Sequence, residues 1–326
     1  MIAVSAAALH QLDPSPAELP RAGRPAPAAL GLRILTLIVI LVPLAGVIAA
    51  PVAVWGWGFS LTDLGLALGM YLATTLGVTV GFHRLFTHRS FETYTWVRVV
   101  FAALGSMAVE GAMIHWVGMH RRHHQFSDGV RDPHSPHGHG SGVGGVLRGF
   151  WHAHIGWFFE EAPAHLDRYA KDVASSRAVR VASGLFGVWV ILGLAIPTVL
   201  GGVITQSWAG ALTGFIWGGL VRVFLVHHVT WSINSACHLW GQRTYRSDDL
   251  STDNALFGLL ALGEGWHNSH HAFPTSARHG LRWWQLDLSY AVIRLLAVVG
   301  LAWKVNVPTL AMQQALRLAS KPRRID

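Results

Sequence analysis

The sequence has little charge and almost no cysteine. Asp, Glu, Lys and Arg make up 13% of its 326 residues, about half of the roughly 25% that is usual in soluble domains. Cys237 is the single cysteine, so an internal disulfide is excluded and nothing indicates an oxidising compartment. Hydrophobic residues make up 52% of the chain, which also has 15 tryptophans. This composition favours an integral membrane protein over a soluble domain.

The charge that is present is mostly basic, with 25 Lys and Arg against 17 Asp and Glu. These basic residues are spread among apolar segments and form no continuous stripe, so we expect no nucleic-acid partner and assign the charge to a membrane protein. Residues 1–32 are rich in Ala and Pro, without apolar periodicity, and are predicted to form a disordered tail. They lack a basic region followed by an apolar core, so a cleaved signal peptide is not expected.

Four stretches are long and apolar enough to cross a bilayer, which takes about 20 helical residues. They cover residues 34–55, 61–82, 181–203 and 208–227. Short connections join them in two hairpins, so the sequence predicts an all-α integral membrane protein with four transmembrane helices. Two shorter apolar pieces, 99–109 and 288–303, are expected to be in-plane interfacial helices or to pack on the spans.

The distribution of basic residues predicts the orientation of these helices. Both hairpin tips, 56–62 and 202–209, lack Lys and Arg, whereas the opposite ends of the spans are rich in Arg. Positive residues favour the cytoplasmic side, so both termini are expected there. Segments 83–180 and 228–305 would form a cytoplasmic helical cap on a membrane domain covering 33–305. Residues 306–326 would be a basic C-terminal tail.

Histidine is the residue in surplus, with 20 copies against 17 acidic residues. Three clusters stand out: HRLFTH at 83–88, HRRHH at 120–124 and HNSHH at 267–271. The last two have the spacing i, i+3, i+4, which puts three imidazoles on one face of a helix at about 100° per residue. The first pair is five residues apart, or about 140° on an ideal α-helix, and converges only if the helix ends or distorts between them.

Eight histidines on one predicted side of the membrane indicate a metal centre, and they are too many for one tetrahedral ion, so we expect two ions. Imidazole suits iron, copper, zinc and nickel, so ligand type alone leaves the element open. The segment TWSINSACH at 230–238 adds His238 as a ninth candidate ligand, with Asn234 one helical turn earlier on the same face.

The other histidines are predicted to have ordinary roles. Isolated residues such as His10, His165 and His279 are expected at the surface or packed. A Pro/Gly-rich loop carries three more that we expect at the surface: His134, His137 and His139. His152 and His154, near tryptophans, are expected at the interface or beside the metal ligands. The surplus of histidine therefore separates into nine candidate ligands and eleven others.

At these clusters the sequence resembles the membrane fatty acid desaturases, and specifically their stearoyl-CoA (Δ9) branch. The three boxes occur in the order of that family, and the surrounding DPH (132–134), GW (156–157), NSACH (234–238) and EGWH (264–267) segments also match. The likeness covers about residues 35–305. The NSxxH element and the EGxHNxHH context favour Δ9-type desaturases over other enzymes that have three histidine boxes.

The resemblance implies an enzyme that uses O2 and two electrons at a di-iron centre to insert a cis double bond, at Δ9, into a long-chain acyl group. It implies that Asn234 binds one iron through a water, and that Thr230 and Trp231 line the bend of an acyl tunnel. It also implies nine histidine ligands, namely His83, His88, His120, His123, His124, His238, His267, His270 and His271.

Chemistry of this kind places further demands on the chain. The metal supplies the oxidant, whereas the protein supplies placement, an apolar tunnel and exclusion of water. Imidazole ligands are neutral, so carboxylates are expected to orient them from behind and to temper the charge of the ions. The candidates, by proximity in sequence alone, are Asp128, Asp132, Glu160, Glu161 and Glu264.

Substrate and electron donor are less constrained. Acyl-CoA desaturases of animals carry an Arg-Asp pair just before the second box, where this chain has Gly118 and Met119, so both acyl-CoA and acyl-lipid substrates stay open. No haem-binding or flavin-binding segment follows residue 305. Electrons are therefore expected from a separate protein of the ferredoxin, rubredoxin or cytochrome b5 type, with its reductase.

Two rival functions are considered. A hydroxylase of the same membrane di-iron class would stop at the alcohol. A membrane metal transporter would need polar ligands inside the spans, where they are nearly absent, so the transporter is disfavoured.

Overall fold

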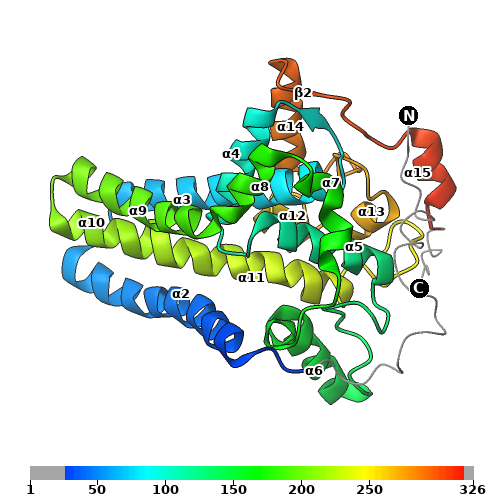
Figure 1. The fold of residues 1–326 in the computed structure, drawn as a ribbon, viewed down its shortest axis with the longest axis horizontal. Helices are drawn as coiled ribbons and strands as arrows, with labels where there is room; N and C mark the ends of the chain where they lie inside the picture. The colour runs from blue at the N-terminus through cyan, green and yellow to red at the C-terminus, as the bar shows by residue number, and fades with distance from the viewer. Residues whose placement is uncertain (1–25, 319–326) are drawn as a thin grey trace, which may run out of the picture.

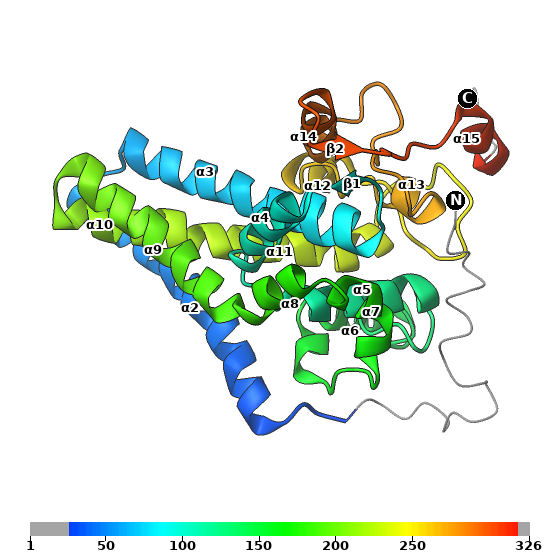
Figure 2. The same cartoon turned by 45° about the horizontal axis from the view of Figure 1, so that its top comes forward.

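The computed structural model describes residues 26–318, which are mostly helical (Figure 1). Within this described part of the chain, four helices are long and apolar enough to cross a membrane: Leu30–Trp57, Leu61–Thr87, Phe186–Thr205 and Trp208–His238. They correspond to the four predicted spans. Figures 1 and 2 show them together at one end of an elongated molecule, with the shorter helices gathered mainly at the other end.

The spans differ in helix type. The first is α2 (Leu30–Trp57) and the third is α9 (Phe186–Thr205). The second and fourth both contain a π-helical segment. They run through α3 (Leu61–Leu76) and η1 (Gly77–Thr87), and through α10 (Trp208–Gly214), η4 (Phe215–Val221), α11 (Arg222–Ser235) and η5 (Ala236–His238).

The remaining elements are short and connect or cover the spans. The helices are α4 (Thr95–Ser106), α5 (Met113–Phe126), α6 (Gly142–His154), η2 (Gly156–Phe159), η3 (Leu166–Ala170), α7 (Lys171–Ala174), α8 (Arg177–Gly184), α12 (Ala255–Leu260), α13 (His267–Ala272), α14 (Leu288–Val298) and α15 (Leu310–Leu316). Strands β1 (Glu92–Thr93) and β2 (Ala302–Trp303) pair antiparallel, which is a small departure from the expected all-α fold.

Several elements begin or end at other residues than the sequence predicts. The first span begins at Leu30, inside the predicted tail, and just before it the amide of Ala28 donates to the carbonyl of Phe159 at 2.9 Å. Residues 1–25 and 319–326 lie outside the described part of the chain, but the predicted C-terminal tail contains α15. The third span begins at Phe186 rather than 181, since residues before Leu185 form the separate α8, which buries Val179. The piece 288–303 divides into α14 and β2.

A buried arginine in the fourth span ties three elements together. Pro197 in α9 has no amide hydrogen, so the carbonyl of Gly193, four residues earlier, loses its partner within the helix. The Nη2 atom of Arg222 donates to that carbonyl at 2.6 Å, and its Nη1 atom donates to the carbonyl of Met107 at 2.7 Å. Met107 follows α4 directly, and Arg222 therefore fixes the turn that leads from α4 to α5.

Candidate metal centre

A change of helix type brings the first histidine pair together. Residues of a π-helix bond i to i+5, and the amide of His88 donates to the carbonyl of His83 at 3.1 Å. Side chains five residues apart therefore lie one above the other, with the two ring centroids 4.7 Å apart. This is the helix distortion that the spacing required, and it occurs at the end of the second span.

The nine candidate ligands form two groups, within each of which one ring nitrogen per residue lies within 4.8 Å of all the others. The first group has five members: His83, His88, His120, His124 and His270. The second group has four: His123, His238, His267 and His271. The two HxxHH boxes contribute to both groups, because adjacent residues such as His123 and His124 point to different ones. The groups are therefore joined through the backbone of α5 and α13.

The ring nitrogens lie close together, and several in the described part of the chain lack a hydrogen-bond partner, as expected for metal ligands. The Nε2 atoms of His83 and His270 are 3.1 Å apart, and those of His238 and His267 are 3.0 Å apart. The buried Nε2 atoms of His88, His123 and His271 have no hydrogen-bond partner among the described residues. Buried polar atoms are rarely left unpaired in proteins, and sets of four and five imidazoles are typical metal donors. The residues present thus fit two metal ions.

Carboxylates hold four of these rings from behind, through Nδ1. Asp132 lies 3.0 Å from Nδ1 of His123, and Asp128 lies 2.9 Å from that of His238. Glu264 and Asp249 lie 2.5 Å from the Nδ1 atoms of His83 and His271 respectively. A carboxylate on Nδ1 fixes the tautomer in which Nε2 carries the lone pair toward a metal. Asp128, Asp132 and Glu264 are three of the five carboxylates named from the sequence, and each contacts Nδ1 of a candidate ligand.

Two sequence expectations about carboxylates fail. Glu160 lies 3.4 Å from His152, outside both histidine groups, and the side chain of Glu161 is exposed in the loop that follows η2. Asp249 was missed, because it lies 22 residues before His271 and no local spacing marks it. The loop around Asp249 folds back over α13, and only the tertiary structure shows this.

Burial keeps most of the rings neutral, as metal binding requires. Desolvation, followed by repulsion from the neighbouring imidazoles, lowers the pKa of His120, His124 and His270 well below its ordinary value. Asp132, by contrast, is held in its charged form. Burial by itself would raise the pKa of Asp132, but the attraction of His123 and His134 outweighs it and the pKa falls. Asp132 is therefore ionised where it meets His123.

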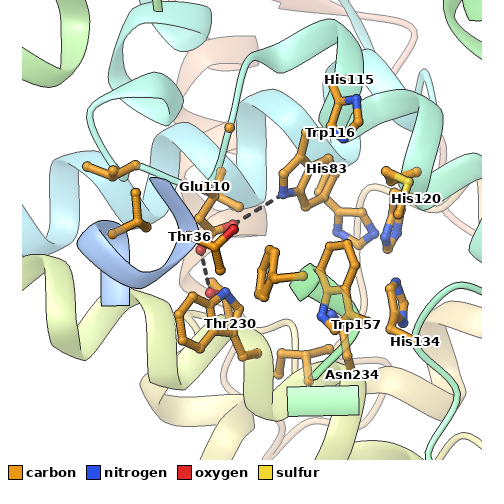
Figure 3. Close-up of a pocket in the computed structure, with 18 of the residues that line it drawn as sticks. Thr36, His83, Glu110, His115, Trp116, His120, His134, Trp157, Thr230 and Asn234 are labelled. Atoms are coloured by element: carbon orange, nitrogen blue, oxygen red, sulfur yellow. Dashed lines mark hydrogen bonds between the residues drawn. The ribbon is translucent and has the colours of Figure 1, made fainter. Parts of the chain in front are cut away.

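One cavity of about 280 Å³ reaches both histidine groups. Its lining is mostly apolar and includes His83 and His120 from the first group and His267 from the second. The predicted tunnel residues Thr230 and Trp231 line it, and so does Asn234. Figure 3 labels Thr230 and Asn234 in this lining. Trp231 is buried and stacks on His227 with ring centroids 4.7 Å apart.

A carboxyl group lies in this apolar cavity. Figure 3 shows Glu110 between Thr230 and Trp116. It accepts hydrogen bonds from the hydroxyl of Thr230 and, at 3.2 Å, from Nε1 of Trp116. Burial raises the pKa of Glu110 to about 7. The Trp116 ring stacks on His120 at 4.9 Å between centroids, so Glu110 is one residue away from a candidate ligand. Sequence analysis did not identify Glu110, a lone acidic residue with no motif around it.

Two histidines outside the ligand set also lie at the site. His134 was predicted at the surface, but it is only 4% exposed and its ring centroid lies 4.4 Å from that of His123. The backbone amide of His134 donates to Asp132 at 3.1 Å, which folds the Pro/Gly-rich loop inward. His279 is packed, one of the two environments predicted for it, 4.4 Å from His270 between ring centroids.

The two residues before the second box have a structural role. A Cβ atom on Gly118 would lie 2.9 Å from the carbonyl oxygen of Leu166, so α5 approaches η3 too closely for a side chain here. Met119 is buried and lines the cavity. An Arg-Asp pair at these positions would not fit this packing.

The family model described as "Fatty acid desaturase" matches residues 62–298. The chain belongs to the fatty acid desaturase family. Among its relatives is a hex-5-enoyl-[acyl-carrier protein] acetylenase of Moorena producens, 42% identical over 280 residues, or 85% of this chain and 87% of that protein.

Two further relatives of this chain are named as lipid desaturases. The sn-1 stearoyl-lipid 9-desaturase of Anabaena variabilis is 42% identical over 252 residues, which are 76% of this chain and 86% of the relative. The delta-9 acyl-lipid desaturase 1 of Arabidopsis thaliana is 37% identical over 266 residues, 80% and 81% of the two chains. These likenesses support an oxidoreductase of fatty acyl chains and confirm the family assignment made from the three boxes.

Proposed function

We propose that this protein is a desaturase that inserts a cis double bond, at Δ9, into a saturated long-chain acyl group of a membrane lipid, with O2 and two electrons as co-reactants. One observation carries the proposal: a single apolar cavity runs to candidate ligands of both histidine groups, His83 and His120 on one side and His267 on the other. An acyl chain in that cavity would lie beside candidate ligands of both ions.

Two iron ions are the proposed cofactor, with the nine histidines as ligands and Asn234 reaching one ion through a water. Iron supplies the activation of O2, which no amino-acid side chain provides. The residues of the chain do the rest. The imidazoles would bind the ions through Nε2, while Asp128, Asp132, Asp249 and Glu264 hold four of the rings in position through Nδ1.

Regioselectivity is a matter of position, because neighbouring methylene groups are chemically alike. The hydrogen bonds of Glu110 to Thr230 and Trp116 fix the shape of one cavity wall. Trp231, stacked on His227, fixes another. These rigid walls exclude water and hold one methylene pair beside the metal ligands.

A lipid headgroup is favoured over coenzyme A. Gly118 and Met119 offer no charge to a phosphate-rich headgroup, and Gly118 has no room for a side chain. Two of the relatives described above are named as acyl-lipid desaturases. The acetylenase relative is named for an acyl-carrier-protein substrate, and acyl-CoA stays open from the sequence, so an acyl thioester is the second candidate.

The topology completes the proposal. The four spans are proposed to cross the membrane with both termini and the cap in the cytoplasm, as the basic residues favour. Electrons would then arrive at the cap from a separate ferredoxin, rubredoxin or cytochrome b5 type protein and its reductase.

Expression in a host of known lipid composition, with a competent electron donor, tests this function. Mass spectrometry should show new Δ9 cis-monoenoic chains in membrane lipids, dependent on O2. Hydroxylated chains would favour the hydroxylase, and alkynes would favour an acetylenase. Unchanged lipids together with altered metal uptake would overturn the desaturase proposal in favour of a transporter.

A further inference from the structure

The first span is packed along only part of its length. Toward its C-terminal end, Gly46 lies against Leu220, and Ala50 and Ala53 join a small core with Ile216 of the fourth span. The N-terminal half diverges from the other spans, as Figure 2 shows for the blue end of α2. The two halves of one helix therefore have different surroundings.

The diverging half forms a wall of the cavity. Five residues of its first three turns line the cavity: Leu32, Leu35, Thr36, Val39 and Ile40. Leu32 and Leu35 line the interior while 47% and 55% of their surfaces are exposed. A side chain that borders a cavity and also the outer surface marks a place where the two meet. Phe186, in the first turn of α9, lines the same cavity.

A proline separates the packed half of α2 from the diverging half. Pro43 lies inside the helix, with Val39 four residues before it. A proline here removes one backbone hydrogen bond and permits bending. The cavity-lining residues of α2 all precede Pro43, whereas Gly46, Ala50 and Ala53, which pack against the fourth span, all follow it. Pro43 therefore lies between the part of α2 that packs on the fourth span and the part that lines the cavity.

We propose that the acyl chain enters the cavity sideways from the bilayer, between the first turns of α2 and the start of α9, as α2 bends at Pro43. The occupant is the acyl chain of a lipid in the leaflet on the cap side. Both helices are long and apolar enough to be membrane spans, so the exposed side chain of Leu35 would face hydrocarbon and an entering chain would stay in an apolar environment. This inference rests on the proposed function, and it names the route and substrate class of the same site.

Cysteine labelling tests the route, because the native Cys237 is fully buried. Leu35→Cys reports on the entry. Ile38→Cys is the matched control, since Ile38 is on the same helix, is 52% exposed and is absent from the cavity lining. Each full-length variant is reconstituted in vesicles of diphytanoyl phosphatidylcholine, whose branched chains do not fit a narrow tunnel. A membrane-soluble maleimide is then added with or without distearoyl phosphatidylglycerol.

The stearoyl lipid should slow labelling of Leu35→Cys at least fivefold and leave Ile38→Cys unchanged. Once labelled, Leu35→Cys should lose at least tenfold in turnover of the lipid, whereas labelled Ile38→Cys stays active. Equal labelling of Leu35→Cys with and without the lipid would overturn lateral entry. So would protection by a soluble stearoyl thioester but not by the lipid, which would indicate entry from the aqueous side.

The protection experiment needs no turnover, so its outcome is separate from the proposed reaction. Protection without any double bond formed would retain the entry route and reject the desaturase. Double-bond formation without protection would retain the desaturase and reject the entry route. A second variant, Pro43→Ala, tests bending: it should lower kcat/KM for the lipid about fivefold while kcat stays within twofold, and an unchanged kcat/KM would reject the hinge.

Discussion

The Oδ2 atom of Asp249 lies 2.5 Å from Nδ1 of His271, although the two residues belong to different segments of the chain. Asp249 also accepts hydrogen bonds from Ser247 and Ser251, which fix its carboxylate in place. A ring held in this way keeps one tautomer and one orientation before any metal binds. Asp249 is thus a positioning residue for the four-histidine group.

Replacing Asp249 should weaken metal binding without removing a ligand. We expect Asp249→Asn to lower the affinity of one ion about 10–100-fold, the usual effect of losing a carboxylate behind a histidine ligand. Metal content after dialysis against a graded chelator measures this. Asp248→Asn, at an exposed neighbouring position, is the control and should bind as the wild type does. Equal affinities for the two variants would show that Asp249 has no positioning role.

Removing a histidine ligand should affect the metal centre more strongly than removing a carboxylate behind one. His120→Ala and His270→Ala each remove one imidazole from the five-histidine group. We expect desaturation to fall at least about 100-fold, because each ligand also sets the geometry of the others, and we expect bound iron to fall toward one per chain. The control is His165→Asn at an exposed position with φ of 61°, which Asn tolerates. Full activity in His120→Ala or His270→Ala would reject the ligand assignment.

Acyl binding should depend on pH through Glu110. Its pKa is raised to about 7 by burial, so the carboxyl is neutral below that pH and ionised above it. An apolar chain binds best beside the neutral form. KM for the acyl substrate should therefore be low below pH 6 and rise above pH 7 in the wild type. It should stay nearly flat in Glu110→Gln, whose side chain keeps the shape. If KM changed with pH in the same way in Glu110→Gln as in the wild type, another group would set the pH dependence.

Gly118 should not accept a side chain. A Cβ atom there would meet the carbonyl oxygen of Leu166 at 2.9 Å, so Gly118→Ala should cost about 1–3 kcal/mol through overpacking. Thermal unfolding in detergent measures the loss as a lower midpoint. Gly184→Ala at the end of α8, where the new Cβ meets nothing within 4 Å, should leave the midpoint unchanged or raise it. A neutral Gly118→Ala would show that α5 can move away from η3.

The features predicted correctly are those encoded locally. An uncharged apolar run is enough to identify a span, and the spacing of His120, His123 and His124 is enough to identify a helix face with three imidazoles. The spacing of His83 and His88 showed that a distortion was needed, but the π-helix that supplies it forms within tertiary packing. Contacts such as those of Asp249 and Glu110 join segments far apart in sequence, so no local pattern predicts them.

The carboxylates behind the rings are divided unequally between the two groups. Asp128, Asp132 and Asp249 all contact the four-histidine group, whereas the five-histidine group has Glu264, which Arg84 also binds at 3.1 Å. Three anions behind one ion and a single, partly neutralised anion behind the other make the two positions electrostatically inequivalent. The ions would therefore be taken up in order, the four-histidine position first, and the enzyme would pass through a half-loaded form during its maturation.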